Sequence, residues 1–219
     1  MSEIFERFKG VIASQGVDSS PSPFNPPATA RQLEDAEAEI GIRLPDSVRS
    51  LYLAADGMRY DDVEARAGSC FAPAIFPNSV YWVDLSRMLT QWDTDRGCAE
   101  IWEEESEDEA HPGDLTRAVR FSERWIPIGR DHTTRNVYLD LDPGPTGVSG
   151  QLFAFDGVGH TNYSARFAES FPAYLEQLAY CIERGLVSWR DGSWCRVDGG
   201  KAVVSLWEVT GRDWAPTMS

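Results

Sequence analysis

The stretch ATARQLEDAEAEIGIRLPDSVRSLYLAADG, residues 28–57, predicts two helices joined by a tight corner. The first helix is expected to begin after Thr29, because Thr29 and Gln32 have the spacing of a capping box. Gly41 follows its last apolar residue, at a position where a left-handed residue commonly ends a helix. The apolar residues with helical spacing are Leu33, Ala36 and Ile40. The first helix is therefore expected to bury one face.

The second helix is expected to begin at Pro45 and Asp46 and to end at Gly57. Proline suits the first turn of a helix because it has no backbone N–H, and the helix dipole favours an acidic residue there. The predicted buried stripe consists of Val48, Leu51, Tyr52 and Ala55. The segment carries no histidine or cysteine, which favours a supporting role for the helix pair over a catalytic one.

Helical spacing of apolar residues predicts three more helices. They cover residues 2–13, residues 84–94, and a segment that begins near Ser170 and ends at Gly185. Residues 21–27 hold four prolines, which exclude a helix or a central strand and predict an extended connector.

Strand patterns dominate the chain after residue 124. RWIPIG, residues 124–129, predicts a short strand that Gly129 stops. Residues 136–142 and 151–156 predict two strands of a hairpin, and the first of them alternates as a half-buried strand does. In that strand Val137, Leu139 and Leu141 alternate with Asn136, Tyr138 and Asp140. The tail, residues 189–210, predicts a hairpin followed by one more strand.

The net charge of the chain is -15, from 20 basic and 35 acidic residues. A surface of this sign repels the phosphates of DNA and RNA, which argues against nucleic-acid binding. It suits either solubility alone or a protein partner with a basic surface.

The cysteine pattern and the N-terminus favour a cytoplasmic protein. Cys70, Cys98, Cys181 and Cys195 include no CxxC pair, so reduced thiols are expected rather than a zinc site or a disulfide framework. The first ten residues lack the long apolar run of a signal peptide. No apolar segment is long enough to predict a transmembrane helix.

Residues 28–57 resemble the N-terminal signature of the SMI1/KNR4 family, also called the SUKH superfamily. In that signature, a helix with a glutamate near its end precedes a small turn, a Leu-Pro pair, and a helix that closes on a polar residue and glycine. The matching positions here are Glu37, Gly41, Leu44, Pro45, Asp56 and Gly57. Looser resemblances to the family are found in WIPIGRD (125–131), in the predicted hairpin (136–156) and in SFPAYLEQLAYCIE (170–183).

The resemblance implies an α+β fold, with helices packed on one largely antiparallel sheet. It divides the chain into an N-terminal helix and connector (1–24), an SMI1/KNR4-like domain (25–185) and a C-terminal β extension (186–219). It implies a protein-binding function without catalysis. Bacterial members are mostly immunity proteins that neutralise a cognate toxin, often a nuclease, and a fungal branch regulates cell-wall synthesis.

Glu37 allows two structural interpretations. It is either an exposed carboxylate with a partner on its own helix, or a buried one that accepts hydrogen bonds from the facing corner and fixes the helix pair.

Catalytic and metal-binding motifs are not found in the sequence. There is no GxSxG, P-loop, GxGxxG or HExxH pattern. His111, His132 and His160 lie in turn-rich segments, and a hydrolase that brings them together in the fold stays the third hypothesis. Asp140 and Asp142 lack the remaining ligands of a calcium loop. We therefore expect no enzyme activity, no cofactor and no metal.

The predicted partner surface is an acidic run. Residues 100–109 hold seven carboxylates in ten positions, interrupted by Ile101 and Trp102. A basic toxin would be attracted by this charge, and an aromatic residue beside it could anchor the interface. The predicted binding residues are Trp102, Glu103, Glu104, Glu105, Glu107, Asp108 and Glu109. The alternative is a regulatory or scaffold module with a partner other than a toxin.

Overall fold

The computed structural model describes residues 3–15, 22–59, 74–77, 79–102, 114–119, 121–131, 134–156, 168–190, 193–203 and 206–210. Its helices are α1 (Glu3–Ala13), α2 (Ala30–Ile40), α3 (Asp46–Tyr52), α5 (Leu85–Trp102), α6 (Phe171–Glu183) and α7 (Trp207–Thr210). Its strands are β1 (Tyr81–Trp82), β2 (Trp125–Arg130), β3 (Arg135–Asp140), β4 (Gln151–Asp156), β5 (Val187–Arg190) and β6 (Ser193–Arg196). None of the described helices is both long and apolar enough to cross a membrane.

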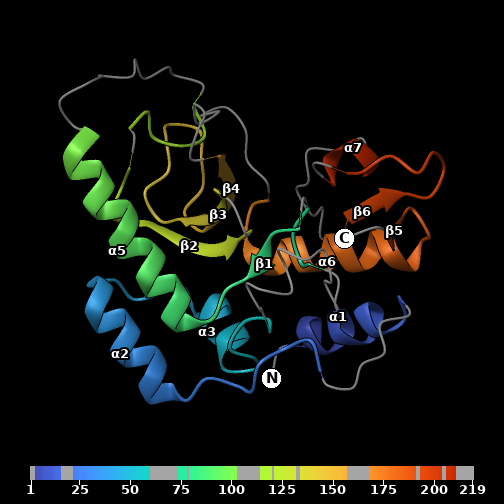
Figure 1. The fold of residues 1–219 in the computed structure, drawn as a ribbon, viewed down its shortest axis with the longest axis horizontal. Coiled ribbons are helices and arrows are strands. Elements are labelled where there is room, and N and C mark those ends of the chain that lie inside the picture. Colours follow the sequence, from blue (N-terminus) through green and yellow to red (C-terminus); the bar gives the residue numbers. More distant parts are fainter. Residues whose placement is uncertain are drawn as a thin grey trace.

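The fold is α+β, as predicted. Strands β1 to β4 form one antiparallel sheet in chain order, and β5 pairs with β6 in a separate hairpin. Helix α5 contacts α2 on one side and β2 on the other, whereas α6 contacts α1, α3 and β5. Helix α2 and the β5–β6 hairpin therefore lie on opposite sides of the molecule, with α3 and α6 between them (Figure 1).

The start of the helix pair follows the sequence prediction. The Thr29 hydroxyl accepts the Gln32 backbone N–H at 3.2 Å, and the Gln32 side-chain oxygen accepts the Thr29 N–H at 2.9 Å. Gly41 ends α2 in the left-handed conformation, with φ of 69°. The capping box and the glycine stop are thus confirmed.

The prediction that the second helix extends to Gly57 is wrong, because α3 ends at Tyr52. Beyond it, the chain pairs with the proline-rich connector instead of continuing as a helix. The Asn25 N–H donates to the Gly57 carbonyl at 3.1 Å, and the Asp56 N–H donates to the Pro26 carbonyl at 3.1 Å. Ala55 still donates to the Leu51 carbonyl at 2.9 Å, but the Tyr52 carbonyl accepts the Ala28 N–H at 3.0 Å instead of the Asp56 N–H.

Helix α1 covers α6 with a fully apolar face. Phe5 and Phe8 are 0% exposed and Ile12 is 1% exposed. The Phe5 ring meets Phe24 of the connector and Trp82 of β1 edge-on, with centroids 5.2 and 6.0 Å away. The N-terminal helix is therefore part of the main core.

Two predictions about the sheet are wrong. Strand β2 continues through Gly129 to Arg130, with an irregular register between Pro127 and Gly129. Strand β3 is buried on both faces rather than half-buried. The cause is a second aromatic cluster, in which Tyr138 and Trp125 each contact the Phe153 ring, with centroid distances of 5.3 and 4.9 Å. This cluster covers the face that the alternation assigned to solvent.

The tail forms the predicted hairpin, but not the strand predicted after it. Within residues 193–203 and 206–210, only a single bridge from Ala202 to Cys195 extends the hairpin, and the short helix α7 follows. Trp194 is 0% exposed, and its indole N–H donates to the Ala74 carbonyl at 2.8 Å. Because Trp194 joins the main core, the extension packs on the rest of the protein.

Candidate functional site

The residues that match the family signature form the joint between α2 and α3. The Glu37 side chain accepts the Leu44 backbone N–H at 2.7 Å through one oxygen and binds the Arg49 guanidinium through the other. The side chains of Glu37 and Arg49 are only 11% and 16% exposed. The structure therefore supports the second interpretation of Glu37, in which a largely buried carboxylate holds the two helices together at the corner.

Pro45 immediately precedes α3, and its carbonyl accepts the Val48 and Arg49 N–H groups at 2.9 Å. Leu44 is 1% exposed and belongs to the main core. The Leu-Pro pair thus fixes where α3 starts and anchors that start in the core.

The Asp56–Gly57 pair positions the start of α5. One Asp56 carboxylate oxygen accepts the Leu85 N–H at 2.9 Å, at the first residue of the helix. Gly57 has a φ of +70°, and a Cβ there would lie 2.6 Å from the backbone of Val83 and of Asp84. Only glycine at position 57 allows the two backbones to come this close.

Burial raises the pKa of Asp56, and the charge of neighbouring Asp84 raises it further.

The middle of α5 is fixed to the sheet by polar side chains. The Tyr138 hydroxyl donates to Asp95 at 2.8 Å, and the Gln91 amide donates to the other Asp95 oxygen at 2.6 Å. Arg130 of β2 binds the Gln91 side-chain oxygen. The Trp92 indole N–H donates to the Glu123 carbonyl at 2.9 Å. Helix α5 is thus held at its start and along its middle.

The same contacts shift two pKa values in this cluster. Burial raises the pKa of Asp95, although hydrogen bonds from Tyr138 and Gln91 and the charge of Arg130 oppose the shift. The pKa of Tyr138 is also raised well above its usual value, by burial and by the Asp95 charge. Tyr138 therefore stays protonated and acts as a donor.

The predicted partner residues begin at the C-terminal end of α5. Trp102 is the last residue of the helix, and its side chain is not among those that the structure describes. The acidic residues Glu103, Glu104, Glu105, Glu107, Asp108 and Glu109 also lie outside the described residues. The placement of the binding surface therefore stays a prediction.

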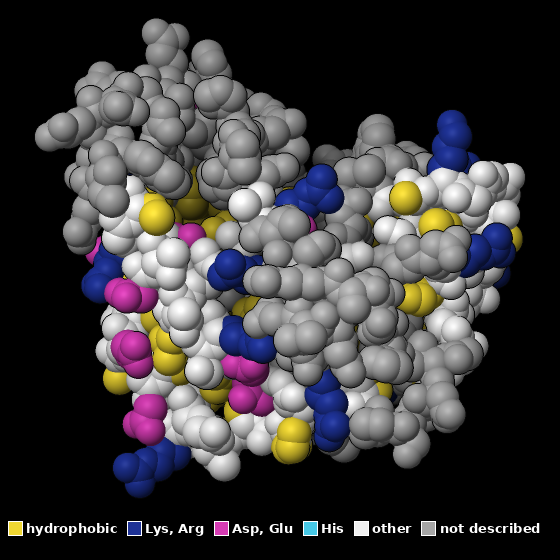
Figure 2. Space-filling view, viewed as in Figure 1, with side chains coloured by type: hydrophobic (Ala, Val, Ile, Leu, Met, Phe, Trp, Pro, Cys, Tyr) yellow, Lys and Arg dark blue, Asp and Glu magenta, His cyan; other side chains and the backbone are white. Residues whose placement is uncertain are grey.

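A second group of acidic side chains lies on the described surface of α2 and α5. Glu34, Asp35 and Glu39 of α2 and Asp93 of α5 are exposed. Figure 2 shows acidic side chains along this part of the molecule. Asp35 is close to Arg31, at 3.7 Å, and both side chains are largely exposed, so this pair neutralises little of the acidic surface.

Asp140 and Asp142, which the sequence raised as possible metal ligands, form hydrogen bonds and an ion pair with other groups of the protein. Asp140 accepts the Gln151 amide at 2.9 Å and the Asp142 N–H at 2.9 Å. Asp142 binds Arg117 at 2.5 Å and the Ser122 hydroxyl at 3.0 Å. His111, His132 and His160 lie outside the described residues. Within the described ranges, no group of three or more His, Cys, Asp or Glu side chains could hold a metal ion.

Comparison with known proteins gives a family match that includes the residues of the corner. The model of the SMI1 / KNR4 family (SUKH-1) matches residues 27–177. The chain is 27% identical, over 170 residues, to a Schizosaccharomyces pombe protein named cell wall biosynthesis/cell cycle regulator smi1. That alignment covers 72% of this chain and 31% of the yeast protein, so the chain spans about a third of its relative's length. Because the family match extends over more than half of its residues, the chain belongs to the SMI1/KNR4 family (SUKH-1).

Proposed function

We propose that this protein is an immunity-type member of the family, which binds a cognate toxin and neutralises it by covering the toxin's basic active surface. The proposal includes no catalysis by this chain. A nuclease-like toxin is the favoured target, because a protein that acts on nucleic acid presents a basic surface that a polyanion-like protein can cover.

The observation that carries the proposal is the relation between α5 and the acidic run. Asp56 fixes the first residue of α5, and Tyr138 and Glu123 fix its middle. The helix then leads at Trp102 directly into residues 103–109, where six of seven side chains are carboxylic acids. These contacts fix the start and the middle of the helix from which the acidic run continues.

The experiment that tests this function has two parts. The product of the neighbouring gene is expressed with and without this protein, and cell survival and co-purification are scored. Glu103, Glu104 and Glu105 are then replaced together by Lys, and binding is measured over a range of salt concentrations. We expect about tenfold weaker binding or more, and a smaller salt dependence, because attraction by the run is lost.

The matched control replaces Glu34, Asp35 and Glu39 on α2 by Lys, which changes the net charge by the same amount. We expect the control to retain most of the affinity, because its charges lie on α2 and not in the acidic run. Equal loss in both variants would show that total charge, not the run, drives binding. If the variant with Lys at positions 103–105 binds as the wild type does, the acidic run is not the binding site.

A regulatory or scaffold function is the second candidate. The observation that favours it is the similarity to the yeast protein, whose name describes a regulator. A neighbouring gene that encodes no toxin, together with co-purification of a cellular partner at natural expression levels, would support this candidate instead.

A further inference from the structure

The end of α6 and the β5–β6 hairpin lie next to one another and are joined by backbone hydrogen bonds. Five residues of this region are together called the hairpin surface: Tyr180, Arg184, Arg196, Val197 and Lys201. The Val197 N–H donates to the Leu186 carbonyl at 3.0 Å, two residues beyond Arg184. The Arg196 N–H donates to the Lys201 carbonyl at 2.8 Å, which holds these two residues together.

The charge of this surface is opposite to that of the whole chain. Two described carboxylates next to it in the sequence form ion pairs, Glu183 with Arg7 at 2.5 Å and Asp198 with Arg196 at 2.6 Å. The Arg184 guanidinium lies 5.4 Å from the centre of the Tyr180 ring, and Lys201 has no ion pair with another described residue. Neither cation forms an ion pair with a carboxylate of the described residues, although the charge of Arg184 contributes to the lowered pKa of Glu183.

Apolar side chains are exposed beside these cations. Val197 is 45% exposed and Tyr180 is 38% exposed, and they are two of the four most exposed large hydrophobic residues in the described ranges. Figure 2 shows basic and hydrophobic side chains next to one another at this end of the molecule. Exposed apolar groups beside cations that form no ion pair with a described carboxylate are typical of a binding surface rather than of a surface that only favours solubility.

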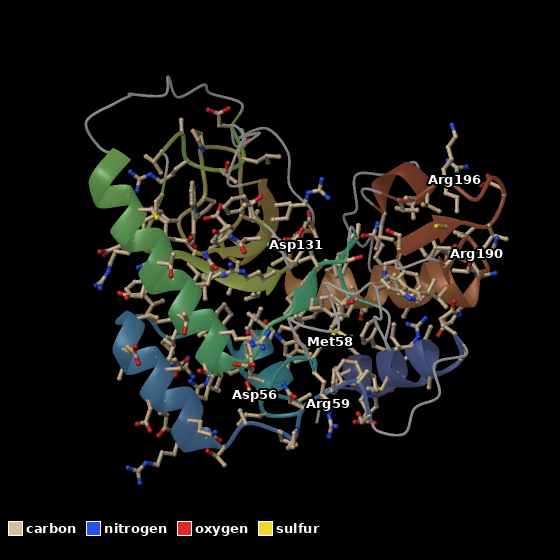
Figure 3. The ribbon with its side chains drawn as sticks, in the orientation of Figure 1. Asp56, Met58, Arg59, Asp131, Arg190 and Arg196 are labelled. Carbon is tan, nitrogen blue, oxygen red and sulfur yellow. The ribbon has the colours of Figure 1, made fainter. Side chains whose placement is uncertain are left out.

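The hairpin surface lies outside the family signature in the sequence. All five of its residues follow residue 177, where the family match ends. In Figure 3, Arg190 and Arg196 extend from the hairpin at the right of the molecule, and Asp56 and Arg59 lie near its lower middle. A partner on this surface would therefore leave the α2–α3 corner uncovered.

We propose that the hairpin surface binds an acidic peptide segment of a second protein. Carboxylates of the segment pair with Arg184 and Lys201, and an apolar side chain of the segment contacts Val197. Stacking on Tyr180 restricts the Arg184 guanidinium, so less entropy is lost when a carboxylate binds to it.

The test uses a fluorescently labelled peptide of glutamates with one central leucine, and a second peptide with glutamine at every glutamate. Binding to the full chain is followed by fluorescence anisotropy. We expect the acidic peptide to bind and the glutamine peptide to bind at least about tenfold more weakly, because two charge pairs are lost. Equal binding of the two peptides, or no binding of either, would overturn the proposal.

The decisive variant replaces Arg184 and Lys201 by Glu. Its control replaces Arg31 and Arg43 by Glu, which changes the net charge equally at exposed positions on the α2–α3 side. We expect about a tenfold loss of affinity in the first variant and a much smaller loss in the control. Equal loss would mean that only the total charge matters, and would reject the site. Thermal unfolding shows whether each variant is folded. If the double variant does not fold, peptide binding is measured with Lys201→Glu alone.

Discussion

Glu37 of α2 and Arg49 of α3 form a largely buried ion pair that ties the two helices together. Glu37 also accepts the Leu44 N–H, so one side chain satisfies a backbone donor and a cation across the corner. The hydrogen bond and the charge of Glu37 raise the pKa of Arg49 above its already high value. The pair therefore stays charged, and its role is to hold a shape.

The first prediction concerns Glu37. We expect Glu37→Ala to lower the free energy of unfolding by about 2–3 kcal/mol, because the Leu44 N–H and the Arg49 cation both lose their partner. Glu34→Ala is the matched control, since Glu34 is exposed on the same helix and makes no described ion pair. Urea denaturation measures both. A cost for Glu37→Ala no larger than the control's would contradict the structural role.

The second prediction compares two glycines with similar backbone angles. Gly41 and Gly57 have φ of +69° and +70°, but only Gly57 lies against another backbone, that of Val83 and Asp84. We expect Gly41→Ala to cost about 1 kcal/mol, from the left-handed conformation alone. Gly57→Ala should cost at least about twice as much, because the two chain segments must move apart.

Thermal or urea unfolding of the two glycine variants checks this difference. If both alanines destabilise the protein equally, the close contact at Gly57 contributes nothing beyond the backbone angle. A larger effect of Gly57→Ala on partner binding than on stability would indicate that this contact also orients α5.

The third prediction concerns the pH dependence of stability. Burial raises the pKa of Asp95, so the folded protein retains a proton that the unfolded chain releases. The stabilisation linked to this proton is complete below the ordinary pKa of about 3.9, and it is lost as pH rises through the folded-state pKa. Asp95→Asn keeps a neutral, hydrogen-bonding side chain between Tyr138 and Gln91 and removes the titration.

The measurement is the difference in urea midpoint between the wild type and Asp95→Asn, from acid to neutral pH. Buried Asp56 and Asp140 also have raised pKa values, and taking the difference cancels their contributions. We expect the variant to gain stability relative to the wild type as pH rises above the ordinary carboxyl pKa. A constant difference would show that Asp95 titrates as in the unfolded chain.

The parts of the fold that could be predicted from the sequence depend on neighbouring residues. The capping box of Thr29 and Gln32, the stop at Gly41 and the Ser170 cap of α6 are all encoded within a few positions. A local pattern identifies them because the hydrogen bonds that they make are local too. The corner could also be anticipated, since Glu37 and Leu44 are seven residues apart.

The features that could not be predicted depend on distant segments. Asp95 and Tyr138 are 43 residues apart, and no spacing in the sequence relates them. The early end of α3 depends on pairing with the connector around Pro26, and the burial of both faces of β3 depends on Trp125 and Phe153. The charge of the hairpin surface is visible in the sequence, but the contact between Leu186 and Val197 that joins its two parts is not.

The last prediction concerns α1, which precedes the residues that the family model matches. Phe8 is fully buried and contacts Phe24 edge-on at 6.3 Å, so Phe8→Ala should leave a cavity and cost about 3–5 kcal/mol. Arg7→Ala on the same helix is the control, and it should cost about 1 kcal/mol at most, because the Arg7–Glu183 pair is largely exposed. Urea denaturation of both variants measures these costs. If Phe8→Ala is as mild as Arg7→Ala, then α1 is an appendage, and the protein folds on the family-matched residues without it.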